Sequence, residues 1–271
     1  VNARDEDHQK RIVAAVESLE NVELLDWFDR TFRMHEAGKI ETLALCSVGD
    51  RDDLSMAYTP GVARVCMAIH EDVSKSYKYT IRKNTVAIVS DGTAGLGLGN
   101  IGPEAAMPVM EGKALLFKEF AGVDAFPLCL NTTDIEEIIE TVERIAPSFG
   151  GINLEDIAAP ACFEIEQRLK ESLDIPVFHD DQHGTAVVVL AALWNSCRLT
   201  GREIGDLSVV IAGMGDAGGA VGRILLAAGV GSIGGVDRDG AVQPCHDNLK
   251  SAHRRLQDHR IPQPQVSTSA R

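Results

Sequence analysis

The chain lacks any cysteine pattern that would indicate a disulfide framework or a structural zinc site. Its 271 residues include six cysteines, which are dispersed and form no CxxC pair. Dispersed cysteines are typical of reduced thiols in the cytoplasm, where disulfides rarely persist. We therefore expect a cytoplasmic protein in which cysteines such as Cys129, within the apolar run AFPLCL, fill a core.

Basic residues and long apolar runs are also scarce. Lys and Arg total 26 against 40 Asp and Glu, so the formal net charge is −14. Nucleic acids and anionic membranes attract basic surfaces, and we expect neither as a partner. No apolar stretch reaches the length of a membrane span, and the first residues lack the basic and apolar segments of a signal peptide.

Aromatic residues are few, at 5%, whereas there are 25 glycines. This balance favours close-packed α/β layers over a β-sandwich. Apolar runs that predict buried strands alternate with helical patterns throughout residues 85–240. Such regular alternation predicts parallel sheets covered by helices on both faces. The predicted fold class is therefore α/β.

The same pattern predicts three parts along the chain. Residues 1–37 form a leading segment with a helix and a strand-like stretch, VELLDWF. Residues 38–182 form a first parallel-sheet domain, and residues 183–271 form an incomplete Rossmann-type domain reached through an apolar helix at 185–199. The last part, from Gln243, has no strand pattern and predicts poor order.

Two adjacent acid pairs follow apolar runs about 25 residues apart: Glu155-Asp156, and Asp180-Asp181 in FHDDQHGTA. Adjacent carboxylates repel each other unless a cation neutralises them, and burying them unpaired is costly. An acidic pair by itself is most often a solvated turn. Two pairs beside apolar strands instead predict an oxygen-ligand site for Mg²⁺ or Mn²⁺.

A dinucleotide-binding fingerprint lies in VVIAGMGDAGGAVGRILLAAG. Gly213, Gly215 and Gly218 form a GxGxxG turn between a predicted strand and helix, and Asp237 ends the next strand. This arrangement predicts a turn that approaches a pyrophosphate closely, with an acid for the adenosine ribose. Asp237 favours NAD because it would repel a 2′-phosphate, while the adjacent Arg238 keeps NADP possible.

A second glycine-rich loop, with Gly97, Gly99 and Gly102, follows the strand TVAIVS. No acid ends the next strand, so the loop does not predict an independent dinucleotide site. It could present backbone N–H groups to the phosphates of the same cofactor, or it could be a packing turn.

Two side chains are candidates for acid–base chemistry. Lys113 lies on an apolar helix that we expect to begin near Pro108, which would place the lysine in the first turn. There, burial beside cations could lower its pKa into the range of a general base. Tyr58 precedes the Pro60-Gly61 turn and could donate a proton, although a tyrosine in this context usually packs.

Taken together, four blocks closely resemble the small bacterial malic enzymes, over a span from about Gly38 to Ala241. The blocks are AYTPGVA, SDGTAGLGLGNIGPEAAMPVMEGKALLFKEFAGVDAFPL, GGINLEDIAAPACFEIE and IPVFHDDQHGTA. The resemblance implies a malic-enzyme N-terminal domain followed by a partial Rossmann domain. It also implies oxidative decarboxylation of malate to pyruvate and CO₂, with NAD or NADP and Mg²⁺ or Mn²⁺, in a homodimer or larger homo-oligomer.

The resemblance assigns roles residue by residue. Lys113 matches the general base and Tyr58 the general acid of the family. Three carboxylates match the metal ligands of the family, namely Glu155, Asp156 and Asp181. Asp180 matches a residue beside the metal. The leading segment also resembles the end of an ACT-type regulatory domain.

The chain departs from the family after VDRDGAV, where the family continues through further strands and helices. We therefore expect this chain to turn over malate poorly or not at all. Residues 38–182 should fold and bind metal weakly, and the nucleotide-binding half should be loose or depend on a partner chain. An alternative is a non-catalytic subunit that binds metal or dinucleotide and pairs with a full-length homologue. A metal-independent dehydrogenase would leave the LEDI and HDDQH motifs unexplained.

Overall fold

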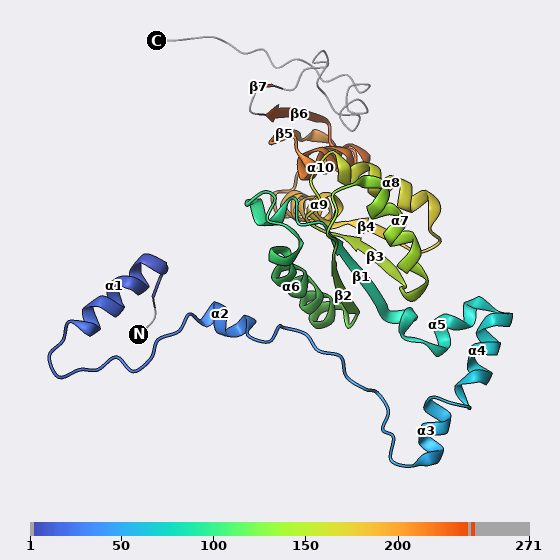
Figure 1. Ribbon diagram of the computed structural model, residues 1–271. Helices are drawn as coiled ribbons and strands as arrows, with labels where there is room; N and C mark the ends of the chain where they lie inside the picture. Colours follow the sequence, from blue (N-terminus) through green and yellow to red (C-terminus); the bar gives the residue numbers. More distant parts are fainter. Residues whose placement is uncertain (1–2, 238–239, 242–271) are drawn as a thin grey trace, which may run out of the picture. The chain divides into compact units, whose positions relative to one another are not determined.

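The structure is a computed structural model that describes residues 3–237 and 240–241 (Figure 1). It divides into two compact units, residues 1–43 and the remainder of the chain. Arg238 and the stretch from Gln243, for which poor order is predicted, lie outside the described residues. The predicted boundaries at residues 37/38 and 182/183 stay predictions.

The first unit contains two helices, α1 (Glu6–Glu17) and α2 (Arg30–His35). Each begins at an aspartate, Asp5 or Asp29, whose side chain accepts a backbone N–H of the first turn. The predicted strand in this unit was wrong, because residues 22–28 are irregular. Alternating apolar residues form a strand only when a neighbouring strand can pair with them.

The second unit begins with short helical segments that lead to the first sheet. In chain order these are α3 (Arg51–Ala57), α4 (Val62–Glu71), η1 (Val73–Lys75), α5 (Ser76–Tyr79) and η2 (Ile81–Asn84).

The first sheet contains four parallel strands in the order β2-β1-β3-β4. Their bounds are β1 (Thr85–Ser90), β2 (Asp124–Cys129), β3 (Gly151–Leu154) and β4 (Val177–His179). Side chains alternate between the two faces of a strand, and in β1 both faces are buried. Ala87 and Val89 pack into one core cluster and Ile88 into another.

Helices cover both faces of this sheet (Figure 1). Helix α6 (Pro103–Ala121) packs Met110 and Ala114 against Ile88. On the opposite face, α7 (Ile135–Ile145) and α8 (Ala161–Ser172) form the larger cluster with β1, β3 and β4. Single-turn segments η3 (Gly95–Gly97) and η4 (Ala146–Ser148) lie in the connections.

The second sheet has the order β5-β6-β7, with β5 (Ser208–Ala212) parallel to β6 (Ser232–Asp237) and β7 (Gly240–Ala241) antiparallel to β6. Two helices, α9 (Asp180–Thr200) and α10 (Asp216–Ala227), form a third core cluster with these strands. The turn η5 (Ile204–Asp206) joins α9 to β5. The predicted α/β fold, a parallel-sheet domain followed by a partial Rossmann-type unit, is confirmed.

Helix α9 begins five residues earlier than the predicted helix at 185–199. Asp180 and Asp181 therefore occupy its first turn and do not extend strand β4. Acidic residues are favourable there because the first N–H groups of a helix carry a partial positive charge. Among the described residues, no helix is long and apolar enough to cross a membrane.

Candidate metal centre

Three carboxylates meet at the carboxyl ends of two neighbouring strands. Glu155 and Asp156 follow β3, and Asp181 lies in the first turn after β4. The register pairs Leu154 with His179, so both strands end at the same edge of the sheet. One oxygen from each of the three carboxylates lies within 4.8 Å of the others. The structure thus brings together the three acids that the sequence predicts as metal ligands.

Asp156 holds a backbone conformation that few side chains adopt. Its φ is +53°, and its N–H donates to Asp181 Oδ2 at 3.0 Å. The left-handed region costs a non-glycine residue roughly 1–2 kcal/mol, which the surrounding structure must offset. Asp156 Oδ2 is buried and, among the described residues, has no hydrogen-bond partner. A buried carboxylate oxygen without a donor fits a cation ligand.

The acidity of the centre also fits a cation. Burial raises the pKa of Glu155 to about 7, although the hydrogen bond from Asn153 and the charge of Lys113 oppose this shift. Burial and the nearby Asp181 carboxylate raise the pKa of Asp156 to about 6. Glu155 is therefore partly protonated near neutral pH and Asp156 titrates just below it, and a bound cation would favour the charged form of both. An all-oxygen donor set of this kind suits a hard divalent cation such as Mg²⁺ or Mn²⁺.

Lys113 reaches the edge of this cluster from α6. Its Nζ lies 2.6 Å from Asp180 Oδ2 and 3.1 Å from Glu155 Oε1. Burial lowers the pKa of Lys113, but the hydrogen bonds and charges of Asp180 and Glu155 outweigh that effect and raise its pKa above the ordinary value. The predicted lowering by neighbouring cations is wrong, because the groups around the amine are anionic.

The predicted position of Lys113 within its helix was also wrong. Helix α6 begins at Pro103, and Pro108 lies inside it, so Lys113 lies well beyond the first turn. The structure nevertheless places its amine beside the acids, because α6 packs on β1 and β2, and β1 pairs with β3, the strand that precedes Glu155.

Tyr58 is the predicted site residue that the structure does not bring to the cluster. It ends α3, and its side chain is 70% exposed. In the described part of the chain, no hydrogen bond joins its hydroxyl to Lys113 or to the acids. Its role as a general acid stays a prediction.

The dinucleotide fingerprint forms the predicted strand–turn–helix. Gly213 has a φ of +93°, and a side chain at Gly218 would collide with the Gly213 carbonyl. A Cβ at Gly215 would meet open space. The Gly213 N–H donates to the Val236 carbonyl at 2.7 Å, which places Asp237 next to the turn. This cradle at the start of α10 fits a pyrophosphate.

The second glycine loop joins β1 to α6. Gly97, Gly99 and Gly102 all have positive φ values, and Gly102 directly precedes the first residue of α6. Gly92 and Ile101 close the loop with a backbone hydrogen bond of 3.0 Å. Both readings of this loop, as a phosphate contact or as a packing turn, stay predictions.

Sequence reasoning did not single out a buried polar group behind the acids. Glu166 of α8 accepts hydrogen bonds from the His179 N–H, at 3.0 Å, and from His183, at 2.9 Å. Hydrogen bonds to His183 and to Lys170 outweigh burial and lower the pKa of Glu166 to about 2. The two histidines that flank the acids in HDDQH were the available signal.

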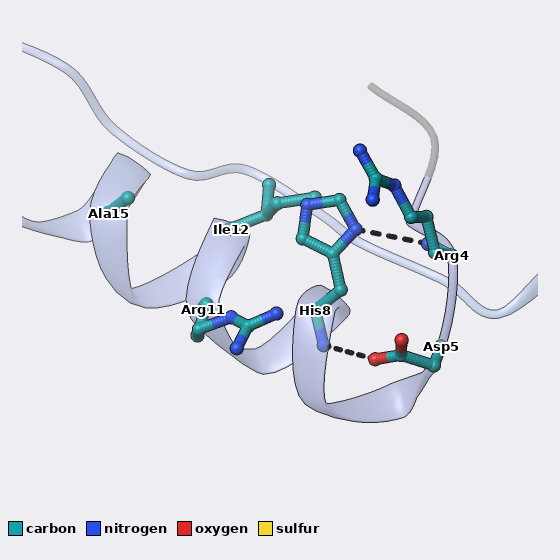
Figure 2. Close-up of a pocket in the computed structure, with 6 residues that line it drawn as sticks. All are labelled: Arg4, Asp5, His8, Arg11, Ile12 and Ala15. Atoms are coloured by element: carbon teal, nitrogen blue, oxygen red, sulfur yellow. Dashed lines mark hydrogen bonds between the residues drawn. The ribbon is translucent and has the colours of Figure 1, made fainter.

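A hollow on α1 is separate from these residues. Figure 2 shows its lining around His8, whose N–H donates to Asp5 Oδ1 and whose Nδ1 accepts from the Arg4 N–H. Both contacts belong to the start of the helix, and none of the predicted site residues lines the hollow.

The fold and the cluster together define a class: an α/β protein in which a parallel sheet presents three clustered carboxylates beside a lysine, followed by a glycine-rich strand–turn–helix. The family model of the malic enzyme N-terminal domain matches residues 37–170. Residues 37–170 therefore belong to the malic enzyme N-terminal domain family.

Known relatives agree with this assignment. An NAD-dependent malic enzyme of Geobacillus stearothermophilus is 63% identical over 242 residues, which cover 89% of this chain and 51% of that protein. A bifunctional malic/malolactic enzyme of Bacillus subtilis is 58% identical, over 76% of this chain and 50% of that protein. The chain thus spans about half the length of these relatives.

Solved structures give the same result. The NAD-dependent malic enzyme of Thermotoga maritima superimposes with a TM-score of 0.81 at 50% identity, covering 87% of this chain and 63% of that one. A putative malic enzyme (malate oxidoreductase) superimposes with a TM-score of 0.80 at 52% identity.

Proposed function

We propose that this chain supplies the substrate and metal half of a malic enzyme, which converts malate to pyruvate and CO₂ with a nicotinamide dinucleotide. One observation carries the proposal: Lys113 Nζ lies 3.1 Å from Glu155, in a cluster where three carboxylates each offer an oxygen within 4.8 Å of the others. A proton acceptor beside a hard-cation site suits the oxidation of a 2-hydroxy acid followed by loss of CO₂.

Glu155, Asp156 and Asp181 would hold Mg²⁺ or Mn²⁺, because their donor set is all-oxygen and Asp156 Oδ2 lacks a partner among the described residues. When bound, the cation would polarise the C2 oxygen, and the nicotinamide would accept a hydride from C2. Three protein carboxylates leave coordination positions for substrate oxygens.

Lys113 would take the proton of the C2 hydroxyl as a neutral amine. Asp180 holds the amine in place at 2.6 Å. Because Asp180 and Glu155 raise the pKa of Lys113 in the metal-free chain, the neutral amine would require a bound cation to offset these negative charges. Tyr58 would then protonate C3 of the enol that remains after CO₂ leaves. Because Tyr58 is exposed in this structure, this step requires the α3 segment to approach the centre.

The glycine turn at Gly213, Gly215 and Gly218 would receive the pyrophosphate, with Asp237 on the adenosine ribose. A carboxylate at this position favours NAD over NADP. The loop with Gly97, Gly99 and Gly102 would contact the same cofactor through backbone N–H groups.

Two further properties belong to the same proposal. We infer a homo-oligomer, because the stretch before the first sheet exposes apolar side chains including Leu45, Met56 and Ile81. We also infer a cytoplasmic location, because the five cysteines of the described residues are free thiols.

A second candidate is a subunit that binds metal and dinucleotide without turnover. Tyr58 favours this second candidate, because its side chain is exposed and, among the described residues, makes no hydrogen bond to the acids. The two candidates differ in turnover and not in metal binding.

The test is a spectrophotometric assay of reduced-cofactor formation with malate, Mn²⁺ and either NAD or NADP. Lys113→Ala should abolish hydride transfer. Lys118→Ala is the matched control, because Lys118 lies on the same helix and pairs with Asp124 at the surface. Equal rates for Lys113→Ala and the parent chain would overturn the mechanism. Metal and cofactor binding without turnover would support the second candidate.

A further inference from the structure

Glu166 is a buried carboxylate that the proposed chemistry does not use. It lies on α8, where its neighbours Cys162, Ile165 and Leu169 belong to the core, so its backbone is firmly anchored. Burying a charge is costly unless donors surround it. Glu166 has such donors around it, and they lie on both sides of the Asp180-Asp181 pair and on its own helix.

Those contacts hold both ends of the segment that carries two of the acids. Glu166 Oε1 accepts the N–H of His179 at 3.0 Å, and Oε2 lies 2.9 Å from His183 Nε2. Asp180 and Asp181 lie between these two histidines in the sequence. One anchored carboxylate therefore fixes the residue before the acidic pair and the residue after it.

His179 extends this arrangement to Asp181. The amide nitrogen of Gln182 donates to His179 Nδ1 at 3.2 Å. In the same orientation, the Gln182 oxygen accepts a hydrogen bond from Arg223 at 3.5 Å. The imidazole proton is therefore assigned to Nε2. That nitrogen is fully buried and faces Asp181 Oδ2 at 3.5 Å.

Lys170 completes the environment of Glu166. Its Nζ lies 2.7 Å from Glu166 Oε1, and its own side chain is partly exposed. The carboxylate thus has a lysine, a histidine and a backbone N–H as partners, which keeps it ionised at neutral pH.

We propose that Glu166 is the positioning residue of the metal centre: by holding His179 and His183 it fixes the first turn of α9, so that the Asp181 carboxylate is directed towards Glu155 and Asp156. The inference rests on the proposed metal site. Residues behind metal ligands commonly orient them, and their loss typically lowers metal affinity by about 10–100-fold.

The experiment measures Mn²⁺ affinity of the purified chain by electron paramagnetic resonance of free Mn²⁺. Glu166→Gln keeps the shape of the side chain and removes its charge, and we expect affinity to fall by about tenfold or more. Glu164→Gln is the matched control, because Glu164 lies on the same helix, is exposed and contacts Arg168. Its affinity should stay within about twofold of the parent chain, as expected for an exposed pair.

His183→Asn separates positioning from simple charge. Removing a carboxylate near a cation site weakens binding at any location, whereas removing a neutral or cationic histidine should leave Mn²⁺ affinity unchanged or raise it. Positioning instead predicts that His183→Asn also weakens binding. This variant serves equally if Glu166→Gln does not fold, which near-ultraviolet circular dichroism would reveal.

Asp181→Asn distinguishes failure of the inference from failure of the metal site. If Asp181→Asn abolishes binding while Glu166→Gln and His183→Asn bind like the parent chain, the positioning role is wrong and the metal site stands. Weakening by Glu166→Gln alone, with His183→Asn unchanged, also overturns the positioning role in favour of a charge effect. If the parent chain binds no Mn²⁺, or Asp181→Asn binds equally well, the proposed site fails, and the inference fails with it.

Discussion

The two sheets of the chain share one strand–helix pattern but differ in how they are covered. In the first sheet, helices lie on both faces, and all but one residue of β1 is buried. In the second, α9 and α10 cover the face that carries Val209 and Ile211, whereas Val210 on the other face is 71% exposed within the described residues. The first sheet therefore holds the acidic cluster on a well-packed support. The second sheet presents the glycine turn from a sheet that is covered on one face within the described residues.

Helix α9 connects the two regions and serves each differently. Its first turn carries Asp180 and Asp181 into the metal centre, whereas Ala186, Leu190 and Leu193 pack in the core of the second sheet. A ligand at the start of a well-packed helix is held more precisely than one on a loop. The geometry of the candidate cation site thus depends on packing in the second region as well as in the first.

The largest effect should come from the core of the first region. Leu169→Ala removes a fully buried side chain, and the free energy of unfolding should fall by about 2–5 kcal/mol. Val210→Ala, in the second sheet, should change it by no more than about 0.5 kcal/mol. Urea denaturation followed by circular dichroism measures both. Similar losses for the two variants would mean that the exposed face of β5 is covered in solution.

The second prediction concerns pH and affects the first region alone. Because the pKa values of Asp156 and Glu155 are raised to about 6 and about 7, the folded metal-free chain binds protons that the unfolded chain has lost. Its stability should therefore fall as pH rises from about 4 to about 7. The lowered pKa of Glu166 adds no slope in most of this range, because its contribution is lost only at lower pH. Burial lowers the pKa of His179, which adds a rise in stability up to about pH 6.5 and offsets part of the fall.

Thermal melts at a series of pH values measure this effect, and a loss of several degrees is expected, since about 1 kcal/mol corresponds to roughly 2–4 °C. Saturating Mn²⁺ should remove the loss, because it binds the deprotonated carboxylates. A melting temperature that rises across this pH range without metal would contradict the account.

The third prediction compares two adjacent glycines in the second region. Gly218→Ala should lower stability by about 1–3 kcal/mol, because the new methyl group collides with the Gly213 carbonyl. Gly219→Ala meets only Arg223, at 3.7 Å, and should raise stability by up to about 1 kcal/mol, as expected for alanine in a helix. Denaturant midpoints decide the sign for each. Equal responses would show that the turn is not packed as described.

The smallest effect should be on cofactor choice. Asp237→Asn removes the charge that would repel a 2′-phosphate and should shift the ratio of NADH to NADPH affinity by about tenfold towards NADPH, which is about 1.4 kcal/mol. Fluorescence titration of both reduced cofactors measures the ratio. Asp206→Asn, an exposed acid before β5, should leave it unchanged. A parent chain that already prefers NADPH strongly would mean that Arg238 outweighs Asp237.

The sequence predicted the two regions unequally well. Alternating apolar runs and helical patterns sufficed for β1 to β6, since apolar runs leave a clear signal. The two-residue antiparallel strand β7 was not predicted, because it has no apolar run. The start of α6 could not be chosen, because Pro103 and Pro108 are both acceptable at a first helical turn. The start of α9 was missed because its first-turn acids also read as the end of a strand.

The candidate site was predictable where ligands follow strands directly. Paired acids after β3 and β4 meet because neighbouring parallel strands end at one edge. Glu166 could not be found in this way, since its role depends on contacts with residues 13 and 17 positions away, at the end of β4 and in α9. The contact between Lys113 and Asp180 likewise depends on how α6 packs, which periodicity does not specify.

The central claim is that Glu155, Asp156 and Asp181 form one cation site in the first region. Isothermal titration of the purified chain with Mn²⁺ at neutral pH tests it most directly, in buffers of different ionisation enthalpy. The account predicts one bound ion per chain, proton release on binding, and loss of at least about a hundredfold in affinity for Asp156→Asn. Absence of binding, or equal affinity in Asp156→Asn, would contradict it.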